Sequence, residues 1–285
     1  MLKKCNRINT QTSFKFKNPL YALDSSTIDL CLSVFDWAKF RRTKGGIKLH
    51  CLFDIKSQIP AFNVMTTAKE ADVTVAKTMK MHLTPDSIVT FDRAYIDFNL
   101  FQSYQDARCF FVTRTKSNLR FELLGQLPIP KKKGLQFDHV VQIKNPFQRK
   151  KYPGKLRLIG YFDHKTNKTY QFLTNNFVLA ATTIAQIYKA RWQVELFFKW
   201  IKQNLKIKSF LGTSKNAVLS QIWVAMIYTL LLAYLKAQSK FDGSILCLSR
   251  KIIESLFFRD HLIDILGLSP KKPPDLSCFS QISFC

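Results

Sequence analysis

One carboxylate stands among cations in the segment YKARWQVELFFKWIK, residues 188–202. The side chains in it with chemistry to offer are Tyr188, Arg191, Glu195 and Lys202. Their spacing of three, four and seven residues places them on one side of a helix, with Lys199 as a further cation and an apolar stripe opposite. The acid can hold a metal ion while Arg191 and Lys202 hold phosphate oxygens. The alternative is an ordinary solvated ion pair between Arg191 and Glu195.

Two further acids stand alone at the ends of apolar runs. Asp24 follows the strand-like run LYAL, and Asp92 follows the β-branched run SIVTF. A strand preceded by a helix predicts a parallel crossover, which would bring the Asp92 strand alongside the Asp24 strand. Each acid also has a local alternative, a turn or cap for Asp24 and an N-cap or surface ion pair for Asp92.

Three carboxylates from separate elements, Asp24, Asp92 and Glu195, would suit a hard divalent cation. Two such ions side by side can activate a water or hydroxyl on one side of a phosphodiester and stabilise the leaving oxygen on the other. No GxGxxG, GxxxxGK[ST], HExxH or GxSxG motif occurs in the chain. Nucleotide-binding, zinc-protease and serine-hydrolase chemistry therefore find no support.

The elements expected around these acids alternate between strands and helices. We expect a hairpin turn or loop at 41–46, strands at 47–55, 59–66, 87–91 and 109–115, and helices at 67–81, 98–104, 182–206 and 217–238. This order predicts an α/β fold with a mixed sheet and flanking helices. The apolar run at 217–237 is long enough to span a membrane, but its polar interruptions favour a helix buried in the core.

Between 119 and 176 the chain becomes basic and strand-like, which predicts a β-rich insertion. Nine cations fall between 131 and 157 against one acid, Asp138, and they include Arg149, Lys150, Lys151 and Arg157. We expect this segment to form a nucleic-acid groove, with Phe147 and Tyr152 as stacking groups. The alternative is a solvated, charged hairpin.

The composition favours a polyanionic partner. Lysine and arginine number 44 against 19 acids, a formal net charge of +25, and nucleic acid is the first candidate. The seven cysteines form no CxxC pair, which predicts reduced thiols. The basic N-terminus contains no apolar run of secretory type, so we expect a cytoplasmic protein without a membrane anchor.

The pattern Tyr188-x2-Arg191-x3-Glu195-x6-Lys202 resembles the YREK signature of the DDE transposases of insertion-sequence family four, relatives of the Tn-five transposase. Asp24 in ALDSST and Asp92 in FDRAY are similar to sequences of the same family, and the resemblance covers about 21–238. It implies an RNase H-like core with adjacent first and fourth strands, interrupted by a β-rich insertion between the second Asp and the Glu.

The resemblance also implies the chemistry and the partners. Asp24, Asp92 and Glu195 would be the catalytic residues and would ligate two Mg²⁺ ions, with Mn²⁺ as a substitute. Tyr188, Arg191 and Lys202 would contact transposon-end DNA. The protein would cut and paste double-stranded DNA through a hairpin intermediate, as a homodimer.

The implied organisation divides the chain into five parts. They are a basic leader at 1–20, the first part of the catalytic core at 21–118, the basic insertion at 119–180, the second part of the core at 181–240 and a C-terminal segment at 241–285.

Two features depart from the family pattern. Only 23 residues precede Asp24, where relatives usually carry a DNA-recognition region, so we expect an N-terminal truncation. The four tryptophans all lie outside the insertion, where relatives can use one to hold a flipped base. The competing hypothesis is a catalytically inactive or repurposed remnant that binds DNA without cutting it.

Overall fold

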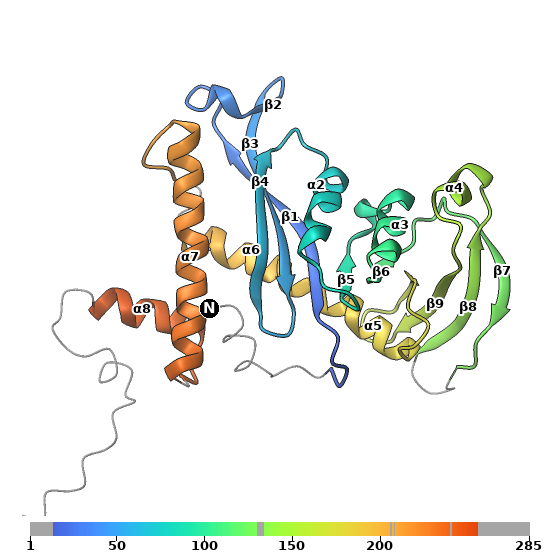
Figure 1. Cartoon of the computed structure of the whole chain (residues 1–285). Helices are drawn as coiled ribbons and strands as arrows, with labels where there is room; N and C mark the ends of the chain where they lie inside the picture. The colour runs from blue at the N-terminus through green and yellow to red at the C-terminus, as the bar shows by residue number, and fades with distance from the viewer. Residues whose placement is uncertain (1–13, 130–133, 206, 208, 240, 256–285) are drawn as a thin grey trace, which may run out of the picture.

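The structure is a computed structural model that describes residues 14–129, 134–205, 207, 209–239 and 241–255. Within these residues, ten strands form one mixed sheet (Figure 1). The strands are β1 (Leu20–Leu30), β2 (Lys39–Arg41), β3 (Lys44–Asp54), β4 (Ile59–Thr67), β5 (Ile88–Phe91), β6 (Phe110–Arg114), β7 (Phe121–Gln126), β8 (Leu135–Ile143), β9 (Leu156–Asp163) and β10 (Lys168–Thr174). The α-helices are α2 (Asp72–Met79), α3 (Phe98–Asp106), α4 (Pro146–Lys151), α5 (Ala181–Ala190), α6 (Trp192–Asn204), α7 (Lys215–Ser239) and α8 (Ile245–Ser255). Short 3-10 turns are η1 (Asp36–Ala38), η2 (Lys80–His82) and η3 (Arg93–Tyr95).

Five strands reproduce the RNase H-like order. β1, β3 and β4 form an antiparallel meander, and β5 then returns through α2 to pair parallel with β1. β6 pairs parallel with β5, so the spatial order is β4-β3-β1-β5-β6. The predicted neighbourhood of the first strand and the fourth core strand is therefore confirmed. A parallel pair needs a crossover, and α2 with η2 supplies it.

The basic segment continues the same sheet. β10 pairs antiparallel with β6, and β9, β8 and β7 follow outward in antiparallel order. Strands were expected in this part of the chain, and they extend the core sheet instead of forming a detached hairpin. The boundaries of the five parts remain a prediction.

The sheet separates two apolar layers because side chains alternate along each strand. On one face, Leu20, Ala22 and Ile28 of β1 pack in a cluster with residues of α5, α6 and α7. On the other, Leu23 packs in a cluster with residues of α2 and α3. Figure 1 shows α2 and α3 on the opposite side of the strands from α6. Asp24, the next residue after Leu23, is thereby directed to the α6 face.

Three expected elements need correction. The helix expected at 67–81 begins only at Asp72, because β4 continues to Thr67 in register with β3. The helix expected at 182–206 is two helices that meet at Arg191, where the backbone stays helical but Arg191 N–H bonds the carbonyl three residues back. Asp24 does not end its strand, since β1 runs on to Leu30 against β3 after β5 has ended.

Helix α7 is only partly a core helix. Val218, Ile222 and Met226 are buried, whereas Val224 is 64% and Ile227 54% exposed. Among the described residues it is the one helix long and apolar enough to cross a membrane, and 39% of its most apolar window is buried in the protein. A single helix of that kind is weak support for a membrane span.

Candidate active site

Asp24 and Asp92 each follow the last paired position of two adjacent parallel strands. Leu23 of β1 is in register with Phe91 of β5, and each aspartate is the next residue of its chain. Asp24 Oδ1 accepts a hydrogen bond from Ser25 N–H at 2.8 Å. Asp92 accepts one from Ala94 N–H at 3.2 Å and caps η3, so the local N-cap alternative describes part of its role.

Glu195 reaches the same region from the other side. Val194, Phe197, Phe198 and Ile201 bury the apolar stripe of α6 in the cluster below β1, which fixes the rotation of the helix. Glu195, on the first turn of α6, is thereby held near the joint with α5.

Arg191 connects the two acids at that joint. Its Nη1 lies 3.4 Å from Asp24 Oδ2 and its Nη2 lies 2.5 Å from Glu195 Oε1. The Arg191 side chain is only 10% exposed, while those of Asp24 and Glu195 are 18% and 32% exposed. The solvated-pair alternative therefore does not describe Arg191 and Glu195, because the guanidinium is buried and shared with a strand residue.

The charges of Asp92 and Glu195 both act on Asp24. Burial raises the pKa of Asp24 to about 6, and the charges of Glu195 and Asp92 push it in the same direction. The Ser25 N–H and Arg191 oppose that rise. Within the part of the chain that the structure describes, no three His, Cys, Asp or Glu side chains are grouped closely enough to hold a metal ion as they stand. The single shared pocket of Asp24, Asp92 and Glu195 thus remains a prediction.

A cavity of about 620 Å³ opens beside Asp92. Its walls combine aromatic rings with cations, and the residues that line it include Arg114, Tyr161, Tyr170, Phe172, Tyr188, Lys189, Arg191 and Trp192. Arg114 lies over the ring of Tyr170 at 4.8 Å, and Arg191 lies over the ring of Tyr188 at 5.7 Å.

Most residues of this wall were not predicted from the sequence. Tyr161 and Tyr170 lie directly opposite each other on β9 and β10. Two tyrosines on adjoining strand-like runs were the signal that could have indicated them, although only the pairing register shows that they meet. Trp192, 57% exposed, lines the cavity from α6 instead of from the insertion.

The expected DNA-contacting residues of the helix pair have different surroundings. Tyr188 is half-buried, with its ring 5.1 Å from that of Phe172. Lys202 donates to the carbonyl oxygen of Thr27 at 2.7 Å, three residues beyond Asp24 on β1. Lys199 is exposed. The expected contacts of Tyr188, Lys199 and Lys202 with DNA remain a prediction.

Two of the three cationic side chains of α4, those of Arg149 and Lys151, already have partners within the protein. Arg149 donates to the Ile143 carbonyl oxygen at 2.7 Å and to Glu122 at 2.6 Å. Lys151 lies over the ring of Phe147, which is 69% exposed, at 4.6 Å. Lys150 is exposed.

Two expectations for the basic segment are wrong. Tyr152 is 1% exposed in the core with Phe101 and Phe111, so its ring cannot stack on a base. Arg157 is buried and forms a two-pronged ion pair with Asp138, at 2.8 and 2.6 Å. Tyr152 follows the last residue of α4, and Arg157 lies on β9. Counting charges does not reveal that either side chain is buried.

Comparison with known proteins places these residues in a family. The model of the transposase DDE domain matches residues 15–231, which include Asp24, Asp92, Arg191 and Glu195. The chain belongs to this family. The match supports the resemblance to the DDE transposases of insertion-sequence family four.

Similar transposases share this region. The chain is 32% identical over 271 residues to the y4zB protein of Sinorhizobium fredii, named as a transposase. The aligned region covers 94% of this chain and 75% of the relative. It is 30% identical to a protein of Geobacillus stearothermophilus named as a transposase for the insertion sequence element IS5377, covering 84% of this chain and 62% of the relative.

A solved structure with a related arrangement is that of piggyBac transposase in a synaptic complex with hairpin DNA. The TM-score is 0.49 at 12% identity, covering 91% of this chain and 59% of that chain. This likeness is weak, and the RNase H-like assignment stands on the strand order of the sheet.

Proposed function

We propose that this DDE-family chain is a transposase that cleaves phosphodiester bonds at the ends of an insertion sequence and transfers the cut strands, by a cut-and-paste route. The observation that carries the proposal is the convergence at Arg191. A strand residue, Asp24, and a helix residue, Glu195, share one buried guanidinium, and Asp92 follows the strand position next to Leu23. By family likeness the proposal extends to a homodimer on double-stranded DNA.

The donor set fits a divalent cation with a preference for oxygen. Asp24, Asp92 and Glu195 would hold Mg²⁺, as two ions, with Mn²⁺ as a substitute. Burial raises the pKa of Asp24 to about 6, and the negative charges of Glu195 and Asp92 act in the same direction; those two charges would favour a cation beside Asp24. When bound, the ions would activate the attacking oxygen and stabilise the leaving one.

Residues of the chain itself would bind and orient the DNA. Arg191 would exchange its carboxylate partners for phosphate oxygens when a cation takes over the neutralisation of Asp24 and Glu195. A guanidinium is suited to both partners because its fork of donors matches a carboxylate and a phosphate alike. Arg114 and Lys189, on the wall of the cavity beside Asp92, supply further positive charge for the strand end.

The aromatic part of the same wall would contact the sugar and base next to the cleaved bond. Tyr161, Tyr170 and Trp192 offer ring faces there, and stacking of a base on an aromatic ring is tolerant of sequence. This supports a role in holding a strand end close to Asp92.

Replacing Glu195 with glutamine tests the proposal. The substrate is a pre-nicked duplex that carries the element's own terminal repeat, assayed with Mg²⁺ at high protein concentration. We expect Glu195→Gln to slow cleavage by about a thousandfold or more, since each 1.36 kcal/mol of lost transition-state stabilisation is about tenfold in rate. DNA affinity should be unchanged or tighter, because Arg191 and Lys199 still attract phosphate.

A matched control separates this from a general effect of removing a glutamate. Glu254→Gln makes the same change at an exposed position of α8 and should leave cleavage unchanged. Undiminished cleavage by Glu195→Gln would remove Glu195 from the mechanism. DNA binding by the unmutated chain without any cleavage would favour the inactive, DNA-binding remnant.

A further inference from the structure

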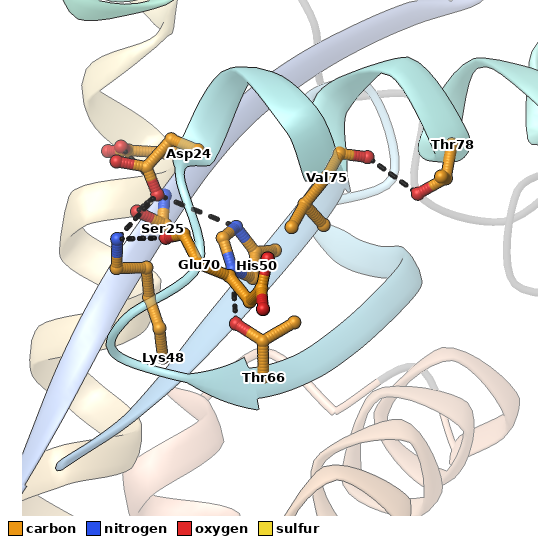
Figure 2. Close-up of polar contacts among 9 residues, drawn as sticks. Asp24, Ser25, Lys48, His50, Thr66, Glu70, Val75 and Thr78 are labelled. Carbon is orange, nitrogen blue, oxygen red and sulfur yellow. Dashed lines mark hydrogen bonds and ion pairs between the residues drawn. The ribbon is translucent and has the colours of Figure 1, made fainter. Parts of the chain in front are cut away.

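A polar cluster lies on the face of β1 opposite Asp24 (Figure 2). Ser25, the residue after Asp24, is in register with His50 of β3, so both side chains point to the α2 side of the sheet. Ser25 Oγ donates to Asp72 Oδ1 at 2.7 Å. Lys48 Nζ lies 3.2 Å and His50 Nδ1 3.6 Å from the same oxygen. Asp72 therefore gathers three groups from two strands at the first residue of α2.

The cluster is built into the protein. The His50 side chain is 1% exposed, and those of Lys48 and Asp72 are 14% and 31% exposed. Burial lowers the pKa of His50 to about 4, so this ring is neutral at pH 7 and Lys48 is the charged partner of Asp72. The other ring nitrogen of His50 lies 3.0 Å from Thr66 Oγ1 on β4. The ring is held between two fixed oxygens, as Figure 2 shows on its Thr66 side.

Ser25 links this cluster to Asp24 through its own backbone. Its N–H donates to Asp24 Oδ1 at 2.8 Å, while its hydroxyl donates to Asp72 at 2.7 Å. The peptide unit that orients the Asp24 carboxylate is thus anchored from the other face of the strand. Asp72 cannot take part in the chemistry directly, because the sheet lies between it and the joint at Arg191.

The same helix also supports the segment after Asp92. Val75 of α2 and Tyr95 of η3 are buried in one apolar cluster, and η3 begins directly after Asp92. A shift of the α2 N-terminus would therefore disturb the surroundings of both strand carboxylates.

We propose that Asp72 is a positioning residue that acts through Ser25 to fix the orientation of the Asp24 carboxylate for cation binding. Lys48 neutralises Asp72 and His50 limits its movement. This inference rests on the proposed function, since it assigns Asp24 to a cation. Partners that orient a metal ligand from outside its coordination shell commonly contribute 10- to 100-fold to metal affinity or activity.

The test measures Mn²⁺ affinity of the full chain without DNA, by calorimetric titration. We expect Ser25→Ala and Asp72→Ala each to weaken Mn²⁺ binding by about 10-fold or more. Ser25→Thr and Asp72→Asn retain the hydroxyl donor and the oxygen acceptor, and each should restore most of the affinity. Because Asp72 acts through Ser25, the two losses should not add. The Ser25→Ala/Asp72→Ala double variant should have the same Mn²⁺ affinity as the single variant with the lower affinity.

Thr78→Ala is the matched control. It removes a hydroxyl that bonds the Val75 carbonyl oxygen within α2 at 2.8 Å, outside the cluster, and should leave Mn²⁺ affinity unchanged. Unchanged affinity in Ser25→Ala and Asp72→Ala, with Glu195→Gln still impairing binding, would overturn the positioning role and spare the proposed function. Losses that add in the double variant would also overturn it. An unmutated chain that binds no Mn²⁺ would overturn both.

Discussion

Arg191 and Asp24 form an ion pair of 3.4 Å between residues 167 positions apart in the chain. The guanidinium is 10% exposed and also bonds Glu195, so two of the three candidate metal ligands share one cation of the protein. This relationship offsets part of the negative charge of the site. It also sets a condition for binding a cation there, because Arg191 would have to give up carboxylate contacts.

Removing the guanidinium should destabilise the metal-free protein. Arg191→Ala leaves Asp24 and Glu195 without their shared counter-charge, and we expect the free energy of unfolding in EDTA to fall by roughly 2–4 kcal/mol. Mg²⁺ should restore part of this loss because it binds the folded state. Urea denaturation with and without Mg²⁺ measures both effects. An equal loss in the two conditions would show that Arg191 does not occupy the place of a cation.

The raised pKa of Asp24 predicts a pH-dependent gain from its removal. Burial raises the folded-state pKa to about 6, against an ordinary value of 3.8, so the folded protein binds this proton more tightly than the unfolded chain. Stability from this group is present below pH 4 and is lost as pH rises through 6. Without metal, Asp24→Asn should therefore be more stable than the unmutated chain at pH 7 by roughly 1–3 kcal/mol, at about 1.36 kcal/mol per pKa unit.

Denaturation curves of both proteins between pH 4 and 7 measure this difference. It should shrink as pH falls from 6 to 4. A difference that stays constant over this range would mean that Asp24 is not strained by burial in the folded state.

The buried ion pair of the basic segment should be structural. Arg157 and Asp138 side chains are 6% and 2% exposed, and Arg157 also donates to the carbonyl oxygens of Asn176 and Leu179. Arg157→Ala would leave Asp138 charged and unpaired in the core, and we expect a loss of about 3–5 kcal/mol in urea denaturation. Lys155→Ala, an exposed neighbour, should cost under about 0.5 kcal/mol. A loss below 1 kcal/mol in Arg157→Ala would refute the structural role.

The exposed lysine of α4, Lys150, should contribute to the salt dependence of DNA binding. With roughly 6–10 phosphate contacts, the log–log slope of affinity against salt concentration should lie around −5 to −9. Lys150→Ala should reduce the slope by about 1 and weaken binding to all sequences alike. Lys215→Ala, an exposed lysine at the start of α7 on the opposite edge of the molecule, is the control (Figure 1). Equal slopes for Lys150→Ala and the unmutated chain would exclude a phosphate contact there.

The sequence by itself determined the elements and the order of the acids. The apolar runs before Asp24 and Asp92, and the spacing from Tyr188 to Lys202, indicate the local backbone structure. Such patterns show which element a residue occupies and with which neighbours it shares a face. They sufficed for the core strands, for the crossover that makes β1 and β5 adjacent, and for the family resemblance.

Only the tertiary structure decided which charged groups meet. The pairing of Arg191 with Asp24, the burial of Arg157 against Asp138 and the link from Ser25 to Asp72 join residues 167, 19 and 47 positions apart. The sequence shows which of these residues are charged, but it contains no local signal for the direction or the burial of their side chains. Strand register and helix packing fix those directions. A one-residue shift of β1 would turn Asp24 to the α2 face of the sheet and Ser25 to the α6 face.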